Sequence, residues 1–241
     1  MIVAGVDEAG RGSVLGPLVV AGVSIDESRV RELVNLGVKD SKLLSAKKRR
    51  TLYGKIKKIA RKVTYEKILP KEIDEVVFRG ERLFRLNYLE AKTMSTVLHK
   101  LDFDHAFIDC CDTNQTRYGQ LVADLIAGRR RMTFTLGEKN PLVEKITSEH
   151  HADRNYPVVS AASIIAKVTR DSFIKILQKR HGEFGSGYPS DPFTISYLKR
   201  CYEASNGFPE ITRMSWITVQ RLQGKIVENE NEVLTELIVD E

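Results

Sequence analysis

The feature that most constrains this chain is its first segment, in which an apolar run ends in two adjacent carboxylates. Residues 2–7 have the composition of a short buried strand, and Asp7 and Glu8 lie at its end. Glycines at positions 10, 12 and 16, the last followed by a proline, predict a turn. Residues 18–25 form a second apolar run. The chain is therefore expected to open with two neighbouring strands of a sheet.

Adjacent side chains on a strand point to opposite faces of the sheet. Asp7 and Glu8 can therefore serve one site only if the strand ends there and the chain turns. The Ala9-Gly10-Arg11-Gly12 segment allows such a turn. The alternative explanation is a polar strand end that faces water.

Two further acids are candidates for the same site, and the first of them also follows an apolar run. Asp109 ends the short apolar run 106–108, and Asp153 lies just before a helix that Pro157 would begin. For Asp153, a helix N-terminal acid favoured by the helix dipole is the alternative. Asp112 competes with Asp109, which we prefer because it directly ends the apolar run.

Four acids from separate strand and helix ends would form a cluster of hard oxygen ligands: Asp7, Glu8, Asp109 and Asp153. Such a cluster suits Mg²⁺ or Mn²⁺ and does not suit Zn²⁺. Two such ions, about 3.5–4 Å apart, can activate water and stabilise the leaving oxygen in phosphodiester hydrolysis. His150 and His151 are alternative ligands, although lone histidines are more often structural.

Hydrophobic periodicity gives the remaining elements. Helical spacing predicts helices over 45–63, 83–101, 118–127, 157–179, 195–204 and 218–227. Short apolar or alternating runs predict strands over 105–109, 132–136 and 143–147. Strands and helices mix early, and helices dominate the end. We therefore predict an α/β domain over residues 1–180 and a helical extension over 181–241.

The charge of the chain is +6 and is unevenly spread. Residues 39–71 hold thirteen Lys or Arg against two acids, and the tail from 225 to 241 holds six acids against one base. A basic flank attracts polyanions such as nucleic acid. From charge alone, a solvated helix face is the preferred explanation.

The sequence shows no signal for a membrane or for secretion. The chain has no apolar run near the roughly 20 residues of a membrane span, and its N-terminus carries no basic leader. The three cysteines, with Cys110 and Cys111 adjacent, suggest no disulfide framework. A cytoplasmic protein is expected.

The motifs as an ordered set resemble those of the type 2 ribonucleases H, and more specifically the archaeal ribonuclease HII group, from about residue 2 to about residue 220. The opening signature is Asp7-Glu8-Ala9-Gly10-Arg11-Gly12 with Gly16-Pro17. The later matches are Asp40-Ser41-Lys42, Leu86-Asn87, Glu90-Ala91, Phe107-Ile108-Asp109, Ala152-Asp153, the segment from Ser160 to Lys167, Gly187-Tyr188-Pro189 and Ser215-Trp216. Ser13 departs from a frequent proline, and Leu43 from a frequent lysine.

This resemblance implies an RNase H-like fold, a mixed five-stranded sheet flanked by helices with a helical C-terminal extension that helps to hold the duplex. It assigns the four carboxylates named above to metal binding. It also implies that Gly10, Arg11 and Gly12 contact the ribonucleotide and that Tyr188 stacks on the sugar beyond it, where it senses the RNA-to-DNA junction. Further substrate contacts would come from Ser41, Lys42, Ser163 and Lys167.

The expected activity is that of an endoribonuclease that hydrolyses the RNA strand of RNA/DNA hybrids and cuts on the 5′ side of single ribonucleotides in duplex DNA, leaving 5′-phosphates. It would use two divalent ions. The expected partners are those nucleic acids, with no membrane, a monomer as the default and a sliding clamp left open. A DNA nuclease on the same fold and a non-catalytic hybrid-binding protein are the competing hypotheses.

Overall fold

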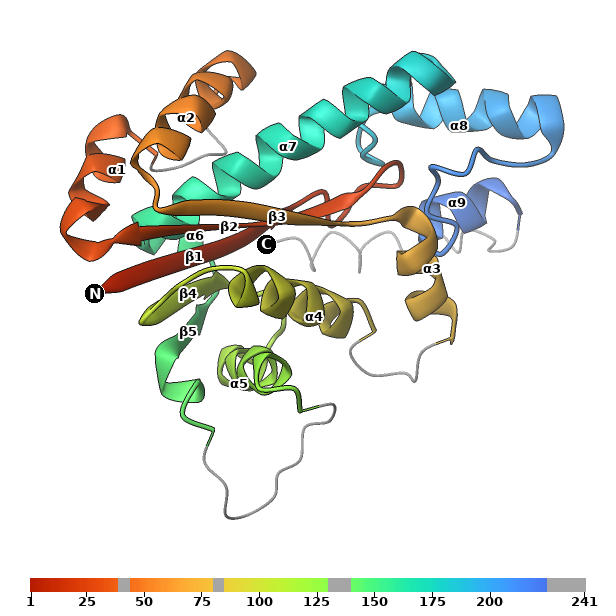
Figure 1. The fold of residues 1–241 in the computed structure, drawn as a ribbon. Helices are drawn as coiled ribbons and strands as arrows, with labels where there is room; N and C mark the ends of the chain where they lie inside the picture. The colour runs from red at the N-terminus through yellow and green to blue at the C-terminus, as the bar shows by residue number, and fades with distance from the viewer. Residues whose placement is uncertain (39–43, 80–84, 130–139, 225–241) are drawn as a thin grey trace.

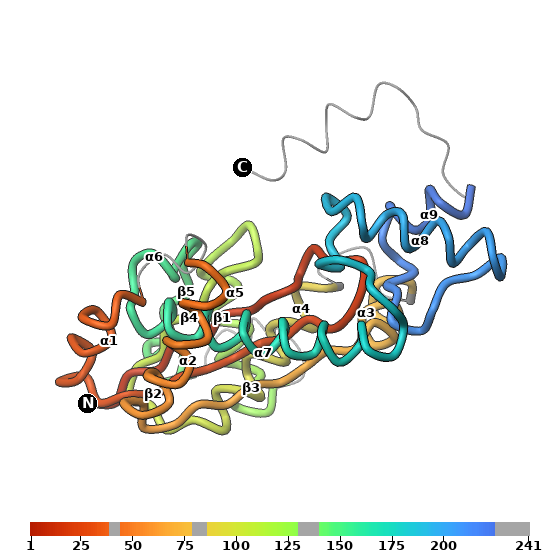
Figure 2. The backbone as a smooth tube through the Cα atoms, turned by 90° about the horizontal axis from the view of Figure 1, so that it is seen from above, coloured from red at the N-terminus to blue at the C-terminus, as the bar shows by residue number. Residues whose placement is uncertain are grey.

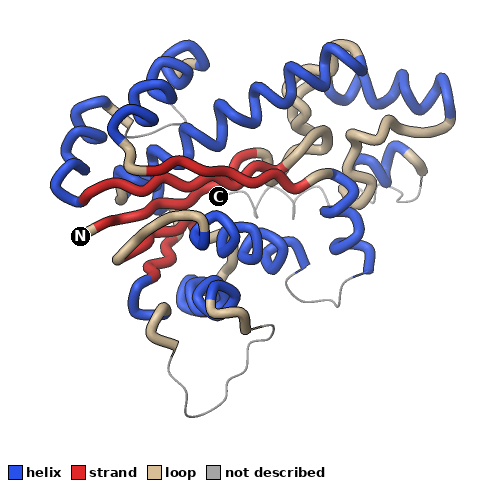
Figure 3. The backbone as a smooth tube through the Cα atoms, in the orientation of Figure 1, coloured by secondary structure: helices blue, strands red, loops and turns tan. Residues whose placement is uncertain are grey.

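A computed structural model describes residues 1–38, 44–79, 85–129 and 140–224. Five strands form one sheet in the order β3-β2-β1-β4-β5. Their bounds are β1 Ile2–Ala9, β2 Leu18–Asp26, β3 Lys62–Ile68, β4 His105–Asp109 and β5 Ile146–Glu149. The strands lie in a single layer between helices (Figure 3). The mixed five-stranded sheet flanked by helices confirms the predicted fold class.

The sheet changes from antiparallel to parallel at its central strand. β1 pairs antiparallel with β2, which pairs antiparallel with β3, whereas β1–β4 and β4–β5 are parallel pairs. In the β1–β4 register Val6 lies opposite Ile108. Since parallel strands end at the same edge of a sheet, Asp7 and Asp109 are brought to one edge.

Helices cover both faces of the sheet (Figure 1). On one face lie α1 Val30–Leu36, α2 Ala46–Ile59 and the long α7 Pro157–His181; on the other lie α4 Arg85–His99 and α5 Gln115–Ile126. Side chains alternate along β1 between two buried cores, one on each face of the sheet. Val3 packs in the core that contains residues of α7, whereas Ala4 and Val6 pack in the core that contains residues of α4 and α5. In the described ranges no helix is both long and apolar enough to cross a membrane.

Close packing of α7 on the sheet depends on small residues. Ala161, Ala162 and Ala166 are fully buried in the helix. On the strand side, a Cβ at Gly5 would lie 2.4 Å from the backbone carbonyl carbon of Val158. The helix therefore approaches β1 at a distance that only glycine permits at this position.

The segment after α7 packs against the turn between β1 and β2. Val14 and Leu15 share a buried cluster with Phe184 and Leu198, the latter on α8 Pro192–Ser205. Figure 2 shows α8 and α9 Ile217–Leu222 at the end of the molecule where α7 stops. The first turn of the chain and its C-terminal region therefore share one core.

A bridge from α3 Pro70–Arg79 fixes the same region. The carboxylate of Asp74 accepts hydrogen bonds from the backbone amides of Met214 and Ser215 at 2.9 and 2.8 Å, and from the Ser215 hydroxyl at 2.6 Å.

Several predicted boundaries were wrong. The helix predicted over 45–63 ends at Ile59, because Ala60 is extended (φ −66°, ψ 144°), and the chain turns into the edge strand β3. The strand predicted over 143–147 is a 3₁₀ turn at Val143–Lys145 followed by β5. The last predicted helix, 218–227, is α9, which ends at Leu222. The strand predicted over 132–136 lies outside the described residues. The sequence did not reveal α1, α3 or α6 Ala152–Asn155.

The close contact at Gly5 generates a stability prediction. Gly5→Ala should lower the free energy of unfolding by about 3 kcal/mol, because a new methyl group meets backbone rather than a side chain that can move. Gly54→Ala is the matched control. Gly54 lies within α2, and its Cβ would have open space, so this change should add about 0.5–1 kcal/mol. Urea unfolding measures both, and equal effects would contradict the packing account.

Candidate active site

Three carboxylates gather where β1 and β4 end. One oxygen from each of Asp7, Glu8 and Asp109 lies within 4.8 Å of the other two. Asp7 is buried, and the other two are half-buried. The acids predicted from two separate apolar runs are therefore neighbours.

The strand does not end at Glu8, contrary to expectation. β1 continues to Ala9, and its pairing with β2 reaches Ala9–Val19. What ends is the neighbouring strand, since the β1–β4 pairing stops at Val6–Ile108. Asp109 follows this last pair and is the final residue of β4, so its carboxylate lies where Asp7 and Glu8 follow Val6 on β1.

Asp153 lies on the short helix α6 and lines a cleft together with the three clustered acids. It is 4% exposed, and its Oδ1 has no hydrogen-bond partner among the residues that the structure describes. It does not belong to the compact group of three. Its negative charge nevertheless contributes to raising the pKa of Asp7.

Hydrogen bonds orient the clustered acids. The Asp109 carboxylate accepts from the backbone amide of Ala152 at 2.7 Å, which ties β4 to α6. The Asp7 carboxylate accepts from the Glu8 amide at 2.7 Å and also hydrogen bonds with the Ser163 side chain. Ser163, expected to contact substrate, is thus a direct neighbour of a clustered acid.

Crowding of the acids changes their protonation. Burial, followed by the charge of Asp109, raises the pKa of Asp7 to about 8. Burial, followed by the charges of Asp7 and Glu90, also raises the pKa of Glu8. A cluster that resists its own ionisation is one that a divalent cation would neutralise.

The competing residues have other partners. The Asp112 carboxylate accepts from the amide of Asn114 at 2.9 Å and pairs with Arg117, so it serves the start of α5. His150 Nδ1 lies 3.2 Å from the carbonyl oxygen of Cys110. In the part of the chain that the structure describes, neither histidine joins a group of potential metal ligands.

A cleft of about 620 Å³ opens over the cluster. Its walls combine the four acids with the glycine loop, basic side chains and an aromatic residue. The residues that line it include Asp7, Glu8, Asp109, Asp153, Gly10, Arg11, Gly12, Arg49, Arg50, Ser163, Lys167, Arg170, Ser186 and Tyr188. An acidic floor inside a basic rim fits a phosphodiester that is held beside a cation.

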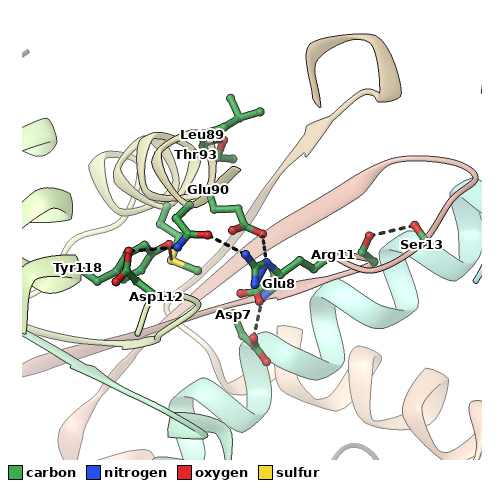
Figure 4. Close-up of polar contacts among 12 residues, drawn as sticks. Asp7, Glu8, Arg11, Ser13, Leu89, Glu90, Thr93, Asp112 and Tyr118 are labelled. Carbon is green, nitrogen blue, oxygen red and sulfur yellow. Dashed lines mark hydrogen bonds and ion pairs between the residues drawn. The ribbon is translucent and has the colours of Figure 1, made fainter. Parts of the chain in front are cut away.

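The glycine loop lies next to the acids. Gly10 has φ +92°, and a Cβ there would lie 2.3 Å from Nε of Arg170, so only glycine fits. At Gly12 a Cβ would meet no heavy atom within 4 Å. The Arg11 guanidinium donates to Glu90 and Asn87, as Figure 4 shows for Glu90.

A fully buried arginine holds the loop from behind. Arg213 donates to the carbonyl oxygens of Gly10 and Arg11 at 2.7 Å each, and to that of Gly16 at 3.1 Å. In a trans peptide the N–H points opposite to the C=O. The amides of Arg11 and Gly12 therefore point away from Arg213. Burial, followed by the charge of Arg170, lowers the pKa of Arg213 to about 9.

Tyr188 lies across the cleft in the loop after α7. Its ring is half-buried and makes a cation–π contact with the Arg170 guanidinium, whose central carbon is 4.7 Å from the ring centroid. Arg170 Nη2 also donates to the carbonyl oxygen of Ser186 at 3.2 Å. Arg170 therefore braces the tyrosine loop against α7.

The remaining predicted contacts divide into two groups. Ser163 and Lys167 lie four residues apart on α7, and both line the cleft. Ser41 and Lys42 lie outside the described residues. Trp216, part of the last motif match, packs on the C-terminal core, with the Arg213 guanidinium 5.0 Å from its ring.

Sequence reasoning assigned no role to three residues of the site: Glu90, Arg170 and Arg213. A weak signal existed for Glu90, because Asn87 and Glu90 are three apart and share a helix face. The two arginines carry no comparable signal, since nothing in the local sequence marks a buried arginine.

Repulsion within the cluster generates a stability prediction for the protein in EDTA. The pKa of Asp7 is higher in the folded than in the unfolded chain, so ionisation costs stability as pH rises from about 4 to about 8. At pH 9 the free energy of unfolding of Asp7→Asn should therefore exceed that of the wild type by more than about 1.4 kcal/mol. The difference should shrink towards pH 4. Urea unfolding at both pH values measures it.

Asp124→Asn provides the control for a buried acid outside the cluster. Asp124 accepts a hydrogen bond from Asn140 at 3.0 Å and faces Arg129 at 3.9 Å. Its neutralisation should destabilise the protein. An Asp7→Asn variant that is also less stable at pH 9 in EDTA would show that the cluster does not repel itself.

Comparison with known proteins identifies the family of the chain. The family model for ribonuclease HII matches residues 4–219. Ribonuclease HII of Pyrococcus furiosus is 41% identical over 228 residues, which cover 94% of this chain and 93% of that protein. Ribonuclease HII of Methanococcus maripaludis strain C6 is 42% identical over 233 residues, covering 95% and 90%.

Solved structures give the same answer. The crystal structure of ribonuclease H2 from Pyrococcus horikoshii OT3 matches with a TM-score of 0.79 and 38% identity, covering 95% of this chain and all of that one. The ribonuclease HII in the PCNA complex from Archaeoglobus fulgidus matches with a TM-score of 0.75 and 38% identity, covering 90% and 95%. The chain belongs to the ribonuclease HII family, and it is an endonuclease of the ribonuclease H class.

Proposed function

We propose that this chain hydrolyses the RNA strand of RNA/DNA hybrids and cuts on the 5′ side of single ribonucleotides embedded in duplex DNA. One observation carries the proposal: the carboxylate cluster and the Gly10–Gly12 loop line the same cleft. A group that senses a 2′-hydroxyl would thus lie beside the groups that cut. Only RNA offers that hydroxyl.

Asp7, Glu8, Asp109 and Asp153 would hold two Mg²⁺ or Mn²⁺ ions. The donor set consists of hard oxygens, and two buried oxygens, Glu8 Oε2 and Asp153 Oδ1, lack hydrogen-bond partners. The raised pKa of Asp7 and of Glu8 supports the same assignment. Bound there, the ions would lower the pKa of a water molecule and neutralise the charge that develops on the phosphate.

The glycine loop would recognise the ribonucleotide through its backbone. Because Arg213 engages the carbonyls of Gly10 and Arg11, the amides of Arg11 and Gly12 point to the opposite side, where they would donate to the ribonucleotide. The open space at Gly12 lets a sugar approach the main chain. Selection would therefore depend on main-chain donors fixed before substrate arrives.

Duplex binding would use the basic rim of the cleft. Arg49 and Arg50 reach it from α2, and Lys167 from α7. Ser163, Ser41 and Lys42 complete the expected substrate contacts. Residues 181–241 would act as a substrate-binding extension to the catalytic domain 1–180, with Tyr188 stacking on the sugar at the RNA-to-DNA junction.

Proposed partners follow from this activity. They are RNA/DNA hybrid and ribonucleotide-containing DNA, met in the cytoplasm by a monomer. A sliding clamp is a further proposed partner, supported by the solved complex of PCNA with ribonuclease HII from Archaeoglobus fulgidus.

Cleavage mapping tests the activity directly. In Mg²⁺ the protein should cut a DNA duplex with one ribonucleotide on its 5′ side and leave the all-DNA twin intact; in EDTA it should cut neither. Asp7→Asn should reduce the rate by at least about 10³-fold, because it removes a charged ligand from the cluster. Equal cutting of both duplexes would replace the ribonuclease with a DNA nuclease, and binding without cutting would indicate a non-catalytic hybrid-binding protein.

Junction sensing makes a separate prediction. Tyr188→Ala should reduce cutting at a single ribonucleotide by about 10-fold or more, because stacking on one sugar or base contributes about 1–3 kcal/mol. Affinity for an all-DNA duplex should fall much less. Tyr202→Ala is the control, since Tyr202 stacks on Phe208 and does not line the cleft. Equal losses of cutting and of affinity would refute junction sensing.

A further inference from the structure

We propose that Glu90 and Asn87, both on α4, are positioning residues that hold the Arg11 guanidinium by its lateral edge and leave Nη1 to bind a phosphate oxygen of the ribonucleotide strand. The inference rests on the proposed function, because it assigns a phosphate contact to the loop that would recognise the ribonucleotide. It concerns residues outside the carboxylate cluster.

The geometry of the arginine fork defines the free atom. Nε donates to Glu90 Oε1 at 3.0 Å, and Nη2 donates to Asn87 Oδ1 at 2.7 Å. Nε and Nη2 form one edge of the planar guanidinium. Within the described ranges no protein acceptor is recorded for Nη1, and Arg11 lines the cleft with its side chain 38% exposed. Figure 4 shows Arg11 between Glu90 and the Asp7–Glu8 pair.

A hydrogen bond to Asp112 fixes the orientation of the Asn87 side-chain amide. Asn87 Nδ2 donates to Asp112 Oδ2 at 3.1 Å. Because a carboxylate accepts and does not donate when ionised, the amide nitrogen must face Asp112 and the amide oxygen must face Arg11. Asp112 is itself held by the Asn114 amide and by Arg117. Both acceptors of Arg11 are therefore rigid before substrate binds.

Stability alone does not explain a buried carboxylate at position 90. The Glu90 side chain is fully buried, and its carboxylate interacts with Arg11 and with the Cys111 thiol. A buried ion pair often contributes less to stability than apolar residues of the same volume would. Aligning Arg11 gives this carboxylate a function that an apolar side chain could not supply.

Two substitutions at Glu90 separate positioning from simple charge balance. Glu90→Gln keeps the reach of the side chain and an oxygen for Nε but loses the charge. Glu90→Asp keeps the charge but shortens the reach by one methylene. If position matters, kcat/KM on a duplex with one ribonucleotide should fall less than about 3-fold in Glu90→Gln and about 10-fold or more in Glu90→Asp. If charge matters, the order reverses, and the proposal is overturned.

The loss should act through Arg11 and appear in KM. In an Arg11→Ala background, Glu90→Gln and Glu90→Asp should differ by less than about 2-fold, as in a double-mutant cycle with one shared contact. Loss of a phosphate contact that is present in both ground and transition states raises KM, whereas partial unfolding lowers kcat and leaves KM unchanged. Asp124→Asn, the destabilised control, should therefore keep the wild-type KM.

Asn87→Ala guards against a Glu90→Asp variant that fails to fold. It removes the Nη2 acceptor without a buried charge and should raise KM several-fold, with no further effect once Arg11 is alanine. An unchanged KM in Asn87→Ala, or the same increase in the Arg11→Ala background, would overturn the proposal. A wild-type protein that ignores the ribonucleotide would instead remove the proposed function, so the two failures are distinguishable.

Discussion

The parallel pairing of β1 with β4 is the constraint on which the site depends. It brings the ends of two apolar strands to one edge of the sheet and leaves Asp7, Glu8 and Asp109 within 4.8 Å of one another. Burial and the like charges at that separation both oppose ionisation of the cluster, and the raised pKa of Asp7 expresses this cost to folding. The fold tolerates it because the glycine at position 5 and the alanines of α7 pack a long helix tightly behind the same strand.

The loop proposed to recognise the ribonucleotide is built differently from the acidic cluster. The glycine loop contributes few contacts of its own and is held by groups that arrive from elsewhere in the chain. Arg213 holds its carbonyls from the C-terminal region, whereas Glu90 and Asn87 hold the Arg11 side chain from α4. A backbone shaped in this way is preorganised, so little entropy remains to be lost when a ligand binds. This arrangement also explains why the first turn and the last helices share one hydrophobic cluster.

The sequence predicted the site better than it predicted some of the fold around it. Asp7, Glu8 and Asp109 could be found because they follow apolar runs, a local pattern with a clear physical meaning. Strand β3 was missed because its lysine-rich sequence continues the helical spacing of α2, and only the extended backbone at Ala60 separates the two elements. Arg213 and Glu90 could not be assigned roles, since their partners lie 203 and 79 residues away in the chain. Contacts of that range arise from tertiary packing, which periodicity does not encode.

Anomalous scattering from a crystal soaked in Mn²⁺ tests the central claim most directly, because it locates ions without reference to activity. We expect peaks between Asp7, Glu8, Asp109 and Asp153, which disappear in crystals of Asp109→Asn that retain the same fold. Ions bound only elsewhere on the protein, or four carboxylates that remain without a cation at saturating Mn²⁺, would contradict the account.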